Sequence, residues 1–441
     1  MGAYISYGTG HHAASWRHPE TDVTATRNID HYAALAATAE RHLFDTLFLS
    51  DAPAVFNDDQ QGFGGRVTSF EPVTLMSALA MVTEHVGLVV TSSTTYKEPY
   101  NVAREYASLD LISGGRAAWN LVTTSKLAAA GNFGLAEHPR HADRYRRAEE
   151  FIDVVRQLWD TWDDDAFPAD KALGIYYDQA KRHPVRFCGE FFDLDAELNV
   201  PRPPQGHPVV VQAGSSPAGR ALAGRTADIV FTAQSDLESA ISFAADLDRR
   251  AAAFDRLNPS VLIMPGLTTY IGPTDAEAQE EVRYLQSLIR PEFGVSMLSD
   301  LVGGFDLSGY DVDGPLPSLP PSNANTSRRA LIERLAFDEG LTIRQIYKRM
   351  TTSRGHLTLV GSYDRVADEI ARWFERGAAD GFNVMPPLFP HGLEQFGEHI
   401  LPRLQQRGLF KSRYESGTLR DKLGLRRAVP AHPTPRGIPH A

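Results

Sequence analysis

The sequence lacks the features that mark secreted, membrane and nucleic-acid-binding proteins. It contains a single cysteine, Cys188, so neither an internal disulfide nor a cysteine metal cluster can form. The segment MGAYISYGTG has neither the basic start nor the apolar run of a secretory signal, and no apolar stretch reaches the roughly 18 residues of a membrane helix. The formal net charge is -11 and the basic residues do not cluster, which disfavours nucleic acid or an anionic membrane as a partner. We therefore predict a cytoplasmic protein that acts on a small molecule.

The chain does have the material for a large core, because 42% of its 441 residues are hydrophobic. Eight short apolar runs predict strands at 3–7, 46–50, 86–91, 117–123, 209–213, 229–232, 262–271 and 382–385. Between these runs apolar residues recur at helical spacing, as at Ile29, Tyr32, Ala33 and Ala36. This alternation predicts an α/β fold, a (β/α)8 TIM barrel, with an open doubly wound sheet as the alternative.

Two segments are longer than ordinary connections between strands and helices. We predict insertions at about 163–199 and 290–360 within a single barrel domain that spans 1–428. Barrel enzymes place their specificity in such segments, and the length and glycine content of the second one suggest a lid. The tail over 429–441 is rich in proline and histidine, and we predict that it is disordered.

The active site of a parallel barrel is assembled at the carboxyl ends of its strands. The first strand is followed by His11 and His12, whose imidazoles can donate to or accept from a bound ligand. The segment over 8–13 matches Gly-x-Gly-x-x-Ala, but we reject a dinucleotide site because Trp16 and Pro19 follow where the helix should begin. We expect no metal site, since no ligand spacing connects these histidines with other candidates.

The next strands deliver polar residues to the same end. The candidates for ligand binding are Asp51 after the second strand, Thr91 in a hydroxyl-rich run, and Asn120 and Thr123 at the tip of the fourth strand. A carboxylate or hydroxyl at a strand end can orient the polar edge of a ring. It can equally cap a helix or face solvent, so both interpretations stay open for Asp51 and Thr91.

A second group of candidates surrounds two helix starts. His141 and Tyr145 are four residues apart and can face the same way. Ser215 and Ser216 precede Pro217, which suits a first helical turn, so they lie at an amino terminus that attracts phosphate. A simple serine cap is the alternative.

Three aromatic residues, Phe56, Trp119 and Phe389, are candidates for an apolar substrate pocket, although aromatic residues at a barrel rim can also serve packing alone. The sequence has no Gly-x-Ser-x-Gly elbow, no phosphate-binding loop string and no His-Glu-x-x-His. Glycosidase chemistry would need two acids at the rim, and only Asp51 presents itself.

Several long strings carry a resemblance to a known family. HHAASWRHPE, FEPVTLMSALAMVTEHVGLVVTSSTTYKEPYNVAREYASLDLISGGRAAWNLVTTS, HADRYRRAEEFIDVVRQLWDTWDDDA and LNVPRPPQGHPVVVQAGSSPAGRALAGRTADIVF resemble the nitrilotriacetate, pristinamycin and dibenzothiophene-sulfone monooxygenases of the bacterial-luciferase-like superfamily. The resemblance extends from about residue 5 to about residue 425. It implies a flavin-dependent monooxygenase on a TIM barrel.

The resemblance also implies a cofactor, partners and residue roles. Reduced FMN (FMNH2) would come from a separate NAD(P)H:flavin reductase, and one atom of O2 would reach a small organic substrate through a flavin hydroperoxide. The implied flavin contacts are Asp51, Thr91, His141, Tyr145 and Ser215 or Ser216, with Asn120 and Thr123 lining the ring. We predict that His11 or His12 hydrogen-bonds the hydroperoxide or the substrate. A homodimer or homotetramer is implied as well.

Two other functions remain compatible with these motifs. One is a deazaflavin-dependent oxidoreductase on the same barrel, and the other is a flavin-binding protein without catalysis. Activity with reduced FMN against reduced deazaflavin, and substrate-dependent oxygen uptake, would discriminate among the three.

Overall fold

A computed structural model describes residues 1–55, 62–65, 67–321 and 326–430, without the side chains of residues 326 and 327. Eight parallel strands form a closed barrel, in the order β9-β11-β1-β2-β3-β4-β7-β8, which the pairing of β8 with β9 closes. The barrel strands are β1 (Gly2–Tyr4), β2 (Thr46–Leu49), β3 (Gly87–Ser93), β4 (Ala117–Val122), β7 (Val209–Gln212), β8 (Ile229–Thr232), β9 (Leu262–Gly272) and β11 (Asn383–Val384). The predicted TIM barrel is confirmed.

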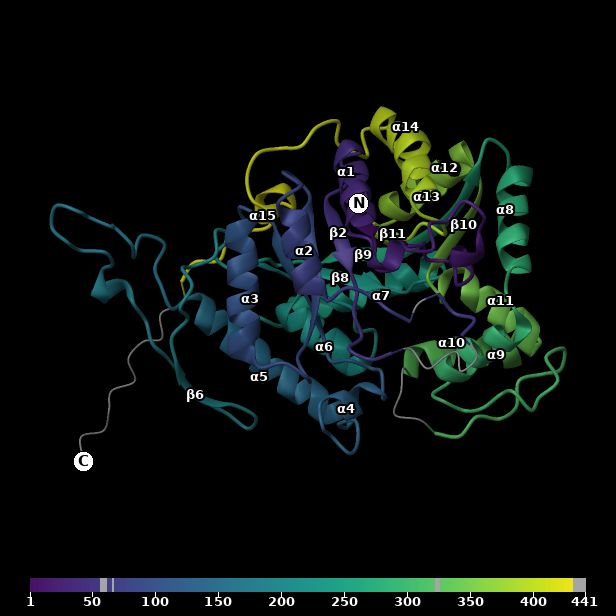
Figure 1. The fold of residues 1–441 in the computed structure, drawn as a ribbon, viewed down its shortest axis with the longest axis horizontal. Coiled ribbons are helices and arrows are strands. Elements are labelled where there is room, and N and C mark those ends of the chain that lie inside the picture. Colours follow the sequence, from purple (N-terminus) through teal and green to yellow (C-terminus); the bar gives the residue numbers. More distant parts are fainter. Residues whose placement is uncertain (56–61, 66, 322–325, 431–441) are drawn as a thin grey trace.

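Helices surround the strands (Figure 1). They are α1 (Ile29–Arg41), α2 (Pro72–Ala80), α3 (Pro99–Ile112), α5 (His141–Trp159), α6 (Pro217–Thr226), α7 (Leu237–Ala251), α8 (Asp275–Ser287), α12 (Tyr363–Glu375), α13 (His391–Gln395), η4 (Phe396–Ile400) and α14 (Leu401–Gln406). Short turns of helix lie in the connections: η1 (Ser15–Arg17), η2 (Ala25–Arg27) and α4 (Ala129–Asn132). Within the described residues, no helix combines the length and apolar character needed to cross a membrane.

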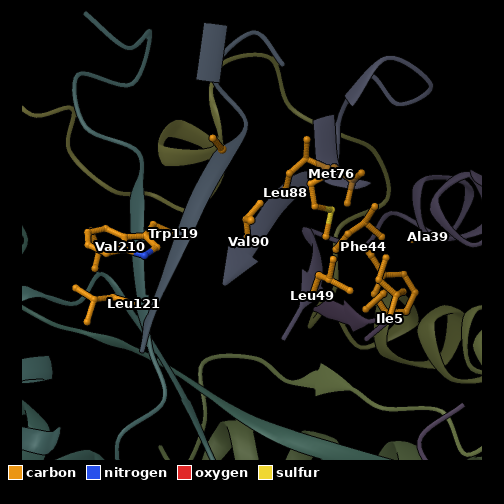
Figure 2. Close-up of a cluster of buried hydrophobic side chains, with 14 of the residues drawn as sticks. Ile5, Ala39, Phe44, Leu49, Met76, Leu88, Val90, Trp119, Leu121 and Val210 are labelled. Carbon is orange, nitrogen blue, oxygen red and sulfur yellow. The ribbon is translucent and has the colours of Figure 1, made fainter. Parts of the chain in front are cut away.

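The strands are apolar on both faces because each face meets a different hydrophobic layer. Val89, Ala118 and Val211 belong to the cluster inside the barrel. Their neighbours Val90, Trp119 and Val210 belong to the cluster that includes the surrounding helices, shown in Figure 2. In a strand, side chains two residues apart share a face. The polar residues that follow the inward-facing residues of each strand therefore lie toward the mouth of the barrel.

The second predicted insertion contains a strand that the sequence analysis missed. After α9 (Pro291–Leu301), α10 (Thr326–Phe337) and α11 (Ile343–Ser353), the chain forms β10 (Leu357–Ser362). This strand pairs with the second half of β9, beyond the part of β9 that pairs with β8. The helices of this segment share a hydrophobic cluster of their own. It is therefore a packed structure rather than a loose loop.

The first predicted insertion forms an antiparallel hairpin of β5 (Val185–Cys188) and β6 (Asp193–Ala196), preceded by η3 (Gln179–Lys181). Figure 1 shows this segment projecting away from the barrel. After α14 the chain returns to the barrel through α15 (Leu419–Lys422). Most of the tail predicted to be disordered, residues 431–441, lies outside the described residues.

Candidate active site

A cavity of about 670 Å³ opens at the carboxyl ends of β4, β7 and β8. It is lined by six of the residues predicted to bind a cofactor, namely Asp51, Thr123, His141, Tyr145, Ser215 and Ser216. These residues come from three connections, after β2, after β4 and before α6, and from the first turns of α5. The fold therefore brings most of the predicted site together.

The other two predicted cofactor residues, Thr91 and Asn120, lie buried in the barrel wall. The Thr91 hydroxyl donates to the Leu49 carbonyl (2.8 Å) and accepts from the Asn120 side-chain amide (2.8 Å). Asn120 Oδ1 is buried and has no donor among the described residues. Val122, on the same face of β4 as Asn120, lines the cavity. The unused Asn120 oxygen is thus an acceptor close to the cavity floor.

The amino terminus of α6 forms one end of the cavity. Ser216 caps this helix by accepting from the Gly219 amide (3.1 Å), and Pro217 occupies the first turn. A methyl group on Gly219 would lie 2.8 Å from the Gly214 backbone, so only glycine allows this close approach. The free amides and dipole of the helix end attract an anion.

The start of α5 contributes a buried cation that the sequence analysis missed. Arg144 is 3% exposed, lines the cavity and donates to the Pro139 carbonyl, while its Nε has no acceptor among the described residues. Burial, followed by the nearby Arg144 charge, lowers the pKa of His141. The rings of His141 and Tyr145 lie 4.7 Å apart. Arg144 could have been found from its three-residue spacing to His141, which places both on one helix face.

The second insertion also contributes to the wall of this cavity. His356 stacks on Phe231, with ring centroids 5.1 Å apart, and Arg328 donates to His356 Nε2 (2.8 Å). Burial, then the Arg328 charge, holds the pKa of His356 well below its usual range, so the ring is neutral with its proton on Nδ1. Burial lowers the pKa of Arg328 to about 10, which leaves it charged at pH 7. Both residues were missed because β10 was not recognised.

The balance of charge in the cavity is positive. Its walls carry the cations Lys126, Arg144, Arg328 and Arg334 against the carboxylates Asp51 and Asp236. Burial, with a smaller contribution from the Glu71 charge, raises the pKa of Asp51 to about 6. The cavity can therefore hold an anionic ligand.

A second cavity, of about 940 Å³, adjoins the first and shares Asp51, Ala52, Ser125 and Lys126 with it. Residues of α9, the segment after it and the loop around Phe63 form its outer wall. Lys126 forms an ion pair with Asp300 of α9 (2.7 Å), which connects the barrel to the insertion. The two cavities together provide adjoining spaces for a cofactor and a substrate.

Two of the three predicted substrate residues, Trp119 and Phe389, line neither cavity. Trp119, labelled in Figure 2, is fully buried on the outer side of β4. Its ring packs against Tyr106 and Phe151, so its assignment to the pocket is wrong. Phe389 is also wrongly assigned, because it is buried in the same outer hydrophobic layer. Phe56 lies outside the described residues.

His11 and His12 are both buried behind the cavity walls. The His11 ring lies 6.0 Å from the Tyr7 ring and 6.2 Å from the His356 ring, and these two neighbours line the second and first cavities. His12 Nδ1 accepts from the Ala14 amide (3.1 Å), a local turn contact. Of the pair, His11 is therefore the one beside the site.

A closed parallel barrel with a cavity at the carboxyl ends of its strands is the arrangement of a barrel enzyme, and the excess of positive charge in this cavity suits an anionic ligand. The family model described as luciferase-like monooxygenase matches residues 9–380, and the chain belongs to this family. The resemblance noted in the sequence is confirmed, and the protein is a flavin-dependent monooxygenase.

Relatives of known activity match nearly the whole chain. N-acetyl-S-(2-succino)cysteine monooxygenase of Bacillus subtilis (strain 168) is 46% identical over 431 residues, which cover 97% of each chain. Nitrilotriacetate monooxygenase component A of Aminobacter aminovorans is 46% identical and covers 95% of each chain. The crystal structure of a riboflavin lyase with modified FMN and substrate riboflavin matches with a TM-score of 0.85 at 31% identity, over 96% of this chain and 94% of the other.

Proposed function

We propose that this protein is the FMNH2-dependent oxygenase component of a two-component monooxygenase. A separate NAD(P)H:flavin reductase would supply the reduced flavin, and one atom of O2 would enter a small organic substrate. The observation that carries this proposal is the cationic first cavity, in which the α6 amino terminus and the buried Arg144 adjoin a second, larger space.

The residues of the first cavity fit the parts of FMN. Ser215, Ser216 and the α6 amides would hold the phosphate, with Arg144 and Tyr145 beside them. The unused Asn120 oxygen suits a ring N–H, and Asp51 and Thr123 offer further polar contacts to the ring edge.

Bound reduced flavin supplies the electrons that activate O2. The task of the chain is to orient ligands and exclude water. Arg328 and Leu331 of α10, with the stacked pair of Phe231 and His356, also line this cavity. We expect His11, next to both cavities, to influence the substrate from behind Tyr7 and His356.

The phosphate assignment predicts a selective loss of affinity. In a Ser215→Ala, Ser216→Ala double variant, the affinity for FMN should fall by at least about 100-fold, because two hydrogen bonds to a charged group are lost and each is worth about 1.5–3 kcal/mol. Riboflavin, which has no phosphate, should bind the variant and the parent equally. Calorimetry with both ligands measures this, and Ser108→Ala on the exposed face of α3 is the control. Equal FMN affinity in the variant would contradict the assignment.

The overall proposal is tested by oxygen uptake with purified protein, NADH, FMN and a generic flavin reductase, on panels of sulfones, thioethers, amines and alkanes. Substrate-dependent uptake that requires the reductase supports it. If the protein had no measurable affinity for FMNH2 in anaerobic calorimetry, the proposal would be wrong.

A further inference from the structure

An exposed apolar surface lies where α2 and α3 end. We call it the helix patch, and it consists of Met81, Val82, Leu111 and Ile112, which line neither of the two cavities. The buried Arg116 brings the two halves of this patch together. Its guanidinium donates to the carbonyls of Ala80 (2.9 Å) and Thr83 (2.8 Å) beside one half and of Ser113 (2.7 Å) beside the other. The four apolar side chains therefore form one surface.

The outer face of α2 extends this surface and carries no charge. The sequence of the helix, PVTLMSALA, contains no charged residue. Thr74 and Ala78 are exposed and Ser77 is half-buried, and Met81 follows on the same face, one turn after Ala78. A helix at the surface of a globular protein normally presents charged residues on the face opposite the core. Depletion of charged residues is instead typical of the centre of a protein interface.

A second exposed apolar surface is the tip of an arm formed by residues 163–184 of the first insertion. The arm is ordered, because Asp170 and Ile175 exchange two backbone hydrogen bonds (2.7 and 3.0 Å) and the rings of Phe167 and Tyr176 pack with centroids 6.0 Å apart. Figure 1 shows that it extends from the barrel on the same side as α3. The exposed side chains of the tip are Leu173, Ile175, Tyr176 and Tyr177.

The degree of exposure at both surfaces points to a protein partner. Leu173 and Tyr176 of the arm tip are 72% and 70% exposed, and Met81 of the helix patch is 73% exposed. Single apolar residues at a surface are ordinary, but gathered ones mark a place of association. Tyrosine is enriched in interfaces, because its ring buries a large area while its hydroxyl keeps a polar contact.

A second copy of this chain is the partner that the charges favour. The formal net charge is -11, so two copies repel each other unless they meet where the surface is uncharged. The outer face of α2 and the helix patch provide such a surface. Because the arm lies on the same side of the barrel as α3, a twofold axis beside α3 lets each arm reach the helix patch of the other copy. The same two surfaces are then used twice, and the assembly closes as a dimer.

We propose that two copies of this chain form a twofold dimer in which the arm of each copy packs its tip against the helix patch of the other. The residues of the arm tip and the helix patch line neither cavity, so the dimer forms with or without flavin. The proposal is therefore independent of the proposed function.

Sedimentation equilibrium of the full chain measures the dimer dissociation constant. Leu173→Ser with Tyr176→Ser should raise this constant at least about 100-fold, because a twofold contact loses each side chain twice. Met81→Ser with Ile112→Ser should have a similar effect. All four changes together should add less than the sum of the two pairs, since the arm tip and the helix patch contact each other.

Val23→Ser with Phe337→Ser is the matched control, because these side chains are also exposed, by 67% and 58%, and belong to neither surface. This variant should dimerise as the parent does. Circular dichroism should show the parent fold in every variant, since each change removes an exposed side chain. A monomeric parent would leave the two surfaces to another partner and overturn the proposal. A dimer that neither pair of changes weakens would overturn it as well.

Cross-linking tests whether the arm of one copy reaches the helix patch of the other. Cys188→Ser first removes the exposed native thiol. One chain then carries Leu173→Cys, and a co-expressed chain with a different tag carries Met81→Cys or Ile112→Cys. Oxidised glutathione should produce a disulfide between the unlike chains for at least one of these pairs, and none when the second chain carries Phe337→Cys. No disulfide with either patch position, or an equal yield with the control position, would overturn the proposal.

Discussion

At the scale of single residues, burial makes the net charge of the first cavity more positive. It raises the pKa of Asp51 and lowers the pKa of Arg144, but an arginine starts so high that it keeps its charge at neutral pH. An aspartate starts low, so a rise to about 6 brings it near the working range. Desolvation therefore weakens the negative charge of the cavity and leaves the positive charge in place.

Asp51 should make the protein less stable as the pH rises. Its pKa is about 6 in the folded protein against 3.8 ordinarily, so the folded state holds a proton that the unfolded state has lost in this range. Between about pH 4 and 6 the stability contributed by Asp51 falls, and above that range the penalty is complete. Asp51→Asn should therefore be more stable than the parent by about 1–3 kcal/mol at pH 7.5, and this gain should shrink toward pH 4.5.

Urea unfolding at several pH values measures this difference. Asp22→Asn is the matched control of opposite sign, because hydrogen bonds from Thr24 lower the pKa of Asp22, which is fully exposed. Its replacement should lose stability at neutral pH rather than gain it. A gain for Asp51→Asn that does not depend on pH would contradict the burial argument.

Residues at strand ends could be predicted from the sequence, because the barrel sends every such residue to one rim. The wrong assignment of Trp119 has a simple cause. Trp119 directly precedes Asn120, and neighbours in a strand face opposite sides. Since Asn120 faces the barrel interior, Trp119 had to face the helices, so the alternation itself contained the correction.

At the scale of secondary-structure elements, β10 marks the limit of prediction from pattern. Its residues LTLVGS are few, and the strand lies in a segment rich in glycine and proline. The signal was nevertheless present, since a glycine precedes the run and an amphipathic helix, α12, follows it. Without β10, the placement of Arg328 and His356 at the site could not be foreseen, because it depends on long-range pairing with β9.

The contact between the loop after β7 and α6 should be sensitive to a single methyl group. In Gly219→Ala the added carbon would lie 2.8 Å from the Gly214 backbone, which cannot move aside as a flexible side chain could. We expect a loss of about 1–3 kcal/mol in unfolding free energy and a weaker affinity for FMN, because Ser215 and Ser216 would shift with the loop.

Gly131→Ala is the control for this change. Gly131 also lies in a helix, α4, but an added methyl group there meets nothing within 4 Å. This variant should keep the stability and FMN affinity of the parent. If Gly219→Ala behaved like Gly131→Ala in both measurements, the close contact would not position the site.

At the scale of the whole molecule, the two ends of the barrel are closed by different parts of the chain. The second insertion lines the cavities at the mouth, whereas the segment that begins with α15 closes the base. Leu419 and Leu425 belong to the hydrophobic cluster inside the barrel. The Leu419 amide donates to the Gly115 carbonyl (2.8 Å), just before β4 begins. The carboxyl-terminal segment is therefore part of the barrel core.

Arg420 holds this segment through a buried ion pair. It is 3% exposed and donates to Asp228 (2.8 Å) at the start of β8 and to the His207 carbonyl (2.7 Å) before β7. Asp228 is needed by the barrel itself, because it also accepts from the Val210 amide (2.9 Å). Removal of the arginine would leave this carboxylate buried beside fewer donors.

Arg420→Met should therefore lower the unfolding free energy by about 3–5 kcal/mol, as is typical when one partner of a buried pair is lost. Arg427→Met, which breaks the exposed pair with Asp164, should cost less than about 1 kcal/mol. Adding Asp228→Asn to Arg420→Met should cost less than the sum of the two single changes, because the stranded charge disappears. Urea unfolding of the parent, the two single variants at Arg420 and Asp228 and the double variant completes this cycle. If the losses of the two single variants simply added up in the double variant, Arg420 and Asp228 would contribute to stability independently, and the ion pair would not hold the segment to the barrel.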